Sequence, residues 1–141
     1  MRSKAPVAAT LFALCLVGGC TNTVLPLAEP LPQDKNGNFV LYVSNQSFDV
    51  SPVDILIHID GKEAVSSDFA VGNQHNWVQH TFQLAPGKHQ LVAVSQKGKA
   101  RVEREFEIVD KHWAVVDYWY PDPDGKAQIA FIIHDRPIGF E

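Results

Sequence analysis

The alternation that sets the architecture of this chain reads Val53-Asp54-Ile55-Leu56-Ile57-His58-Ile59-Asp60-Gly61. Branched apolar residues stand at every second position, and successive side chains of a strand point to opposite faces of a sheet. One face of this strand is therefore expected to be buried. The Asp-Gly pair that follows is the strongest short-range signal for a tight hairpin turn. The stretch predicts a strand over residues 53–59 and a returning strand within residues 62–71.

The period of two continues on both sides of this hairpin. Apolar or alternating runs, separated by turn residues, stand at residues 39–43, 77–84, 89–95, 101–108, 113–120 and 128–134. The last two runs are apolar on both faces, which predicts central strands or a hairpin covered on both sides. No segment carries a helix-length apolar stripe with caps. Seven or eight strands at this spacing predict an antiparallel immunoglobulin-like β-sandwich, with a small β-barrel as the alternative.

The turns in the middle of the chain resemble those of a known kind of module. The segment from Asp60-Gly61-Lys62 to Leu91, with its Ala85-Pro86-Gly87-Lys88 turn, resembles small bacterial sandwich modules such as PEGA domains and the regulatory-like domains beside carboxypeptidases. In such a turn proline presets φ and glycine accepts a positive φ. Those modules are usually non-catalytic, so the resemblance implies a sandwich that is not an enzyme.

The first twenty residues have the layout of an export signal. Two basic residues precede an apolar run at residues 7–17, and Gly18-Gly19 lead to Cys20. The apolar run is too short to span a bilayer, which needs about 20 residues. The motif Val17-Gly18-Gly19-Cys20 resembles the lipobox of bacterial lipoproteins. That resemblance implies removal of residues 1–19 and attachment of fatty acyl chains such as palmitate to Cys20 through a diacylglyceryl group, with an ordinary signal peptide as the alternative.

Cysteine usage supports lipid attachment. Cys15 would be lost with the signal, which leaves Cys20 as the single cysteine of the mature chain. A leftover cysteine in an exported protein needs an explanation, and thioether lipidation supplies one. Two or more acyl chains hold a protein firmly on a membrane. In the lipoprotein class an aspartate after the cysteine is the usual cue for inner-membrane retention, so Thr21 implies an outer-membrane protein facing the periplasm.

The mature chain is expected to hold one domain. Three prolines between Pro26 and Pro32, followed by polar residues, predict a lipidated cysteine and tether over residues 20–38, with a short strand at residues 24–27 as the alternative. Residues 39–141 then form the sandwich, which is long enough to hold a core without disulfides or metal. Loss of Arg2 and Lys4 takes the 12 basic residues to ten against 16 acidic ones, for a mature net charge near −6. This balance argues against nucleic acid as a partner.

Histidine and tryptophan supply the candidate binding residues. The chain has six histidines, but no two of them stand at the spacing of a metal-binding motif. If a metal binds, the first candidates for its ligands are His75, His80 and His89. No cofactor is expected. Exposed Trp77, Trp113 and Trp119 would stack on sugar rings, whereas core filling is the alternative explanation for them.

One charge pair is predicted inside the fold. Asp117 interrupts an apolar run and Arg104 interrupts another, and a buried charge is costly unless it is paired. A structural Arg104–Asp117 pair across the sandwich is the hypothesis that follows.

The function expected from these observations is non-enzymatic. No nucleophile elbow or phosphate-binding glycine loop stands in the chain. We expect a cell-envelope lipoprotein, held on the membrane through Cys20, whose sandwich binds or supports an envelope protein partner. The two alternatives are a carbohydrate- or peptidoglycan-binding module and a periplasmic metal-binding protein.

Overall fold

The described part of the chain is all-β. The structure is a computed structural model that describes residues 29–72, 76–121 and 123–140. These residues form eight strands: β1 (Phe39–Asn45), β2 (Val53–Ile59), β3 (Lys62–Phe69), β4 (Val78–Phe82), β5 (Gly87–Ser95), β6 (Ala100–Ile108), β7 (His112–Trp119) and β8 (Gln128–His134). No helix among the described residues is long and apolar enough to cross a membrane. The predicted signal at residues 1–19, Cys20 and His75 lie outside the described residues.

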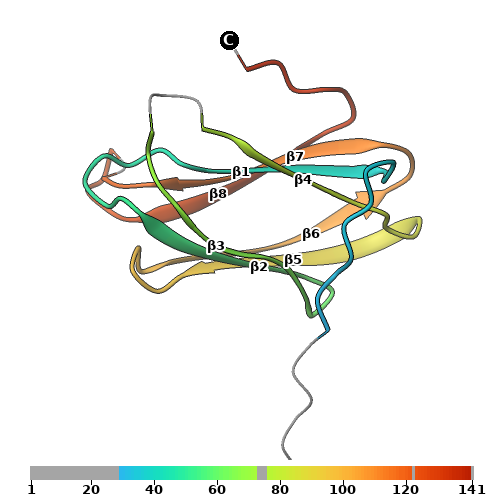
Figure 1. The fold of residues 1–141 in the computed structure, drawn as a ribbon, viewed down its shortest axis with the longest axis horizontal. Helices are drawn as coiled ribbons and strands as arrows, with labels where there is room; N and C mark the ends of the chain where they lie inside the picture. The colour runs from blue at the N-terminus through green and yellow to red at the C-terminus, as the bar shows by residue number, and fades with distance from the viewer. Residues whose placement is uncertain (1–28, 73–75, 122, 141) are drawn as a thin grey trace, which may run out of the picture.

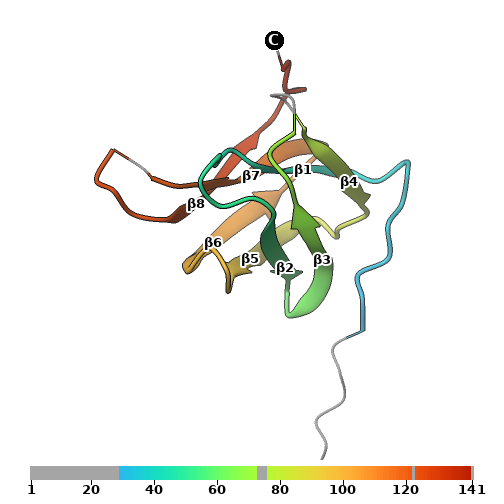
Figure 2. The same ribbon diagram turned by 60° about the vertical axis from the view of Figure 1, so that its left-hand side comes forward.

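The strands form two sheets that pack face to face, with the orders β4-β1-β7-β8 and β3-β2-β5-β6 (Figure 1). The sheets do not close into a barrel, so the predicted sandwich of seven or eight strands is confirmed. Figure 2 shows the same two layers from a second direction. One pairing differs from a purely antiparallel arrangement, because β1 and β7 run parallel with Val40 beside Trp113. Parallel neighbours need a long connection, and the chain between β1 and β7 supplies it.

The core lies between the sheets and takes every second side chain of β2. Val53, Ile55, Ile57 and Ile59 are each at most 1% exposed, and they share one core cluster with Leu41 of the opposite sheet. Burying one such side chain stabilises the fold by roughly 1.5–3 kcal/mol. The predicted hairpin follows directly after β2.

The β2–β3 hairpin has the backbone that its sequence requires. Asp60 has a φ of 51° and Gly61 a φ of 76°. The favoured two-residue hairpin turn needs a positive φ at both central residues, which Asp-Gly accepts readily. The turn therefore fixes the register that puts the apolar side of β2 in the core.

The last part of the predicted tether is attached to the sandwich. We call residues 30–38 the N-terminal strap. The Leu31 amide donates to the Glu63 carbonyl at 2.7 Å, and the Asp34 amide donates to the Thr81 carbonyl at 2.9 Å. The Asn38 side chain both donates to and accepts from the backbone of Leu84, at 2.9 Å each. The folded unit therefore begins before residue 39, and the spacer reaches no further than the residues ahead of the strap.

The strands β7 and β8, whose sequences predicted cover on both sides, differ in their position within the sheet. β7 is central, but β8 ends its sheet, and Ile132 on β8 is 50% exposed. The segment after β8 turns back over the outward face of this sheet (Figure 1). There the ring of Phe140 packs 4.6 Å from that of Trp77 and 4.8 Å from that of Tyr42. This contact partly shields the outward face from water.

The packing of the strap can be tested at Gly37. A Cβ atom at Gly37 would collide with the backbone carbonyl group of Phe82. Gly37→Ala should lower the free energy of unfolding by about 1–3 kcal/mol, measured by urea denaturation, because backbone cannot move aside as a flexible side chain can. Gly139→Ala is the matched control, since nothing lies within 4 Å of its added Cβ. Equal stabilities of the two variants would contradict a docked strap.

Candidate functional site

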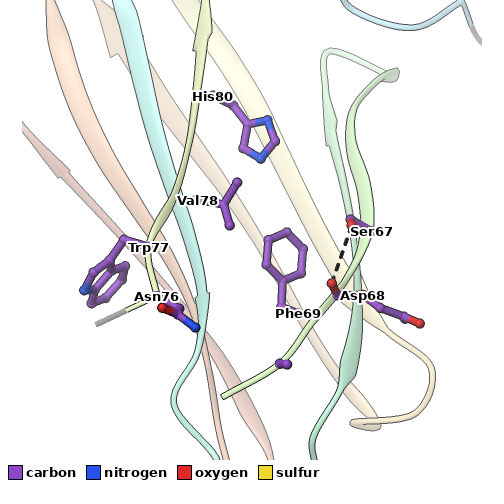
Figure 3. Close-up of a pocket in the computed structure, with 8 residues that line it drawn as sticks. Ser67, Asp68, Phe69, Asn76, Trp77, Val78 and His80 are labelled. Atoms are coloured by element: carbon purple, nitrogen blue, oxygen red, sulfur yellow. Dashed lines mark hydrogen bonds between the residues drawn. The ribbon is translucent and has the colours of Figure 1, made fainter. Parts of the chain in front are cut away.

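The open side of the sandwich between β3 and β4 carries a groove. β3 ends one sheet and β4 ends the other, and a hollow of about 330 Å³ lies between them. We call it the β3–β4 groove (Figure 3). Its lining residues are Ser67, Asp68, Phe69, Ala70, Asn76, Trp77, Val78 and His80.

The interior of the groove is apolar apart from one imidazole. The side chains of Phe69, Val78 and His80 point into the space between the strands, whereas those of Trp77 and Asp68 point away from it (Figure 3). Val78 is 44% exposed, whereas Phe82 at the other end of β4 is fully buried. Asp68 is held outside by Lys97, whose Nζ lies 2.9 Å from its carboxylate. The groove therefore offers an apolar floor and one polar group.

That polar group, His80, has an unsatisfied ring nitrogen. Its Nδ1 lies 3.4 Å from Nε2 of Gln33 in the strap, while its Nε2 is buried and has no hydrogen-bond partner. Burial lowers the pKa of His80, which keeps the ring neutral. With the Gln33 amide donating to Nδ1, the proton of the neutral ring sits on Nε2. A buried donor left unpaired costs about 1–3 kcal/mol, so this atom favours a ligand with an acceptor.

The strand edges beside the groove are open along most of their length. The strap pairs with β3 at Glu63 and with β4 near Phe82. Among the described residues no other segment pairs with the outer edge of either strand. A free edge presents unpaired backbone N–H and C=O groups, which is a template for an added strand. The strap shows that an extended segment fits both edges.

The structure does not bring the predicted metal ligands together. His80 lies on β4 and His89 on β5, in different sheets, and His75 lies outside the described residues. Both ring nitrogens of His89 are occupied, Nδ1 by Asp60 at 2.6 Å and Nε2 by the Ala85 carbonyl at 2.7 Å. Burial of the ring opposes protonation, but the hydrogen bonds to Asp60 and Ala85 and the charge of Asp60 outweigh it and raise the pKa of His89. No group of three metal-ligating side chains is found within the described residues.

The three tryptophans do not form one stacking platform. Trp113 and Trp119 stand at opposite ends of β7, separated by about 20 Å at the rise of an extended strand. Trp77 is stacked on Phe140. Trp119 is 41% exposed and shares a hollow with Phe48, whose 70% exposure no sequence pattern indicated. The arrangement offers separate aromatic side chains rather than a shared sugar-binding surface.

The predicted Arg104–Asp117 pair is wrong. Arg104 lies on β6, the end strand of the opposite sheet, where it is exposed and donates to the Glu103 carbonyl at 2.8 Å. Asp117 lies on the outward face of β7 and accepts from the Ser44 hydroxyl at 2.9 Å. The parallel pairing of β1 with β7 brings Ser44 beside Asp117, and no local pattern in the sequence encodes that pairing.

Asp117 is a buried carboxyl group whose hydrogen-bond partner within the described part of the chain is a neutral hydroxyl. It is 6% exposed, and the Ser44 hydroxyl that binds it also accepts a 2.7 Å hydrogen bond from the Gln46 amide. Burial raises the pKa of Asp117 to about 7, although the Ser44 hydrogen bond acts in the opposite direction. The group therefore changes charge near neutral pH.

The comparisons add no family to this description. The chain matches no protein-family model, no curated protein and no solved structure. The function of the groove residues Phe69, Val78 and His80 is therefore inferred from their geometry alone. The sequence indicated His80 as a candidate metal ligand, but it carried no signal for an open groove at Phe69 and Val78, because a strand that ends a sheet has the same alternation as a central one.

The burial of Asp117 predicts a pH-dependent difference. The pKa is higher in the folded state than the unfolded value near 3.9, so the carboxyl group destabilises the fold as pH rises from about 4 through 7. Asp117→Asn should therefore be more stable than the wild type at pH values above 7, by about 2–4 kcal/mol, and this advantage should shrink under acidic conditions.

Urea denaturation of both proteins across this pH range measures the difference. Other titrating groups are the same in both, so the difference isolates Asp117. A gap that stays constant with pH would show that the carboxyl group is not buried as described.

Proposed function

We propose that this protein is a lipid-anchored protein of the bacterial cell envelope whose sandwich binds a protein partner without catalysis. The β3–β4 groove is the proposed site, and the partner contributes an extended segment that adds to the edge of β4 or β3. The lipid on Cys20 places the protein on the periplasmic face of the outer membrane. The observation that supports this proposal most strongly is the pair of open strand edges that flank an apolar groove.

The strap supports this mode of binding. Its Gln33 bridges antiparallel to Phe82 on β4, and its Pro30 bridges parallel to Glu63 on β3. In strand addition, backbone hydrogen bonds supply affinity and side-chain pockets supply specificity. The strap uses one end of the two edges, and along the rest Val78 remains exposed beside the buried Phe69.

The unsatisfied imidazole of His80 also supports the addition of a partner strand in the groove. An added strand carries a carbonyl group at every residue, and one such group could accept from His80 Nε2. An apolar side chain of the same strand would cover Phe69 and Val78. A sugar-binding role has less support, since the tryptophans are dispersed, and a metal-binding role lacks an assembled ligand set among the described residues.

Site-specific photo-crosslinking in intact cells tests the groove. A photoreactive residue in place of Ser67, which lines the groove and is exposed, should give a discrete protein adduct. The same probe in place of Glu105, exposed on β6, is the control and should give none. Adding Val78→Lys to the Ser67 probe should reduce the adduct several-fold, because a lysine blocks strand addition at an edge. Equal adducts from both positions, or an unchanged yield with Val78→Lys, would reject the site.

Lipid attachment is tested independently at Cys20. Cys20→Ser should move the protein from the membrane fraction to the soluble fraction, because it removes the sulfur to which the acyl chains attach. Labelled fatty acid should be incorporated into the wild type and absent from the variant. Cys15→Ser is the matched control and should behave as the wild type. If Cys20→Ser stayed on the membrane, the proposed anchor would be wrong while the groove could still bind.

A further inference from the structure

A second hollow, at the opposite end of the sandwich from the strap, is lined by three lysines. It has a volume of about 470 Å³ and lies between the β5–β6 turn, the β7–β8 connection and the β1–β2 loop; its lining residues are Val50, Lys97, Gly98, Lys99, Tyr118, Tyr120, Lys126 and Ala127. Figure 1 shows the first two of these loops together at the end away from the strap. The chain as a whole has a net charge of −4, yet none of these lining residues is acidic. We call this hollow the lysine hollow.

The turn that presents two of these lysines is held rigidly. The carboxylate of Asp54 accepts from the Ser95 hydroxyl and from the Lys97 amide, both at 2.8 Å. The Gly98 amide donates to the Ser95 hydroxyl at 2.8 Å, and the Tyr118 hydroxyl donates to the Gly98 carbonyl at 3.2 Å. The turn amides are therefore occupied within the protein, so the ammonium groups of Lys97 and Lys99 are the donors that this turn can offer to a ligand. A preformed site loses less entropy on binding than a flexible one.

The backbone at Lys99 does not favour a lysine. Lys99 has a φ of 49°, in the left-handed region that glycine accepts without strain. The glycine of this turn stands one position earlier, where a Cβ atom would collide with the ring of Tyr118. Turn geometry thus accounts for Gly98 but not for a lysine at 99. Strained residues of this kind are concentrated at functional sites.

Two carboxylates near the hollow, on β2 and β3, already have partners. Asp54 is directed to the turn backbone and to Ser95. Asp68 pairs with Lys97 at 2.9 Å, but the two side chains are 55% and 52% exposed. An ion pair this exposed to water is weak, so Lys97 can exchange it for a ligand.

We propose that the lysine hollow binds a phosphate-bearing small molecule. The phosphate lies between the ammonium groups of Lys97 and Lys99, and a ring or apolar portion packs against Tyr120, which is 38% exposed. Lysine binds phosphate as a point charge, whereas an arginine fork would suit a planar carboxylate better. The volume exceeds what inorganic phosphate needs and lies in the range of small-molecule sites. The lysine hollow shares no lining residue with the β3–β4 groove, although Lys97 pairs with Asp68 of the groove, and the proposal does not depend on the proposed protein partner.

Amide NMR shifts of the full-length protein in nonionic detergent test the proposal. The probes are glucose 1-phosphate, glucose, inorganic phosphate and detergent micelles doped with phosphatidylglycerol. Glucose 1-phosphate should shift the amides of Lys97, Gly98 and Lys99, glucose should not, and inorganic phosphate should bind more weakly. Shifts with doped micelles alone would assign the phosphate to a lipid headgroup, and shifts with the sugar phosphate would assign it to a soluble ligand; either supports the site.

Two variants decide whether the lysines carry the binding. Lys97→Gln combined with Lys99→Gly should weaken binding at least about tenfold, because charge-assisted contacts are lost. Lys99→Gly alone should weaken binding while keeping or raising the unfolding temperature, since glycine relieves the left-handed strain. Lys88→Gln, at the other end of β5, is the matched control and should bind as the wild type. Absence of shifts with every phosphate probe, equal binding of glucose, or unchanged binding in the double variant would overturn the proposal.

Discussion

Each sheet of this protein has one apolar face, and neither face can stay in contact with water. The alternating isoleucines of β2 and the buried face of β1 therefore require the two sheets to pack against one another. A sandwich built in this way must end at four strands, which are β3 and β6 in one sheet and β4 and β8 in the other. What happens at these ends determines which surfaces remain available for binding.

The sandwich has two lateral sides, where an end strand of one sheet faces an end strand of the other, and these two sides are closed differently. Between β6 and β8 the rings of Phe106 and Phe131 meet at 5.7 Å, so core side chains fill that side. Between β3 and β4 the closure is made by backbone of the strap, and it reaches only Glu63 and the end of β4. The remaining length holds the β3–β4 groove. The same strap that stabilises the fold therefore limits the site and supplies the Gln33 contact that orients His80.

Polar side chains near the turns of this fold have hydrogen-bond partners within the protein. Asp54 fixes the β5–β6 turn, Asp60 and His89 join two turns, and Asn45 donates to the carbonyls of Val50 and Phe69. The buried atoms without a partner among the described residues are Nε1 of Trp77 and Nε2 of His80. Since an unpaired buried donor is costly, the second of these distinguishes the groove from a simple gap in packing.

The sequence by itself determined the strands, the β2–β3 hairpin and, where apolar and polar residues alternate, the face of the strand that enters the core. These features are local: a period of two sets the buried face, and Asp60-Gly61 sets the turn. Tertiary structure alone decided that β1 lies parallel to β7, that residues 30–38 dock on β3 and β4, and that Asp117 meets Ser44 instead of Arg104. Pairing between distant strands depends on how the whole core is filled, and an alternating pattern is the same for an edge strand as for a central one. The groove and the lysine hollow arise at such places, where side chains from segments far apart in the chain converge.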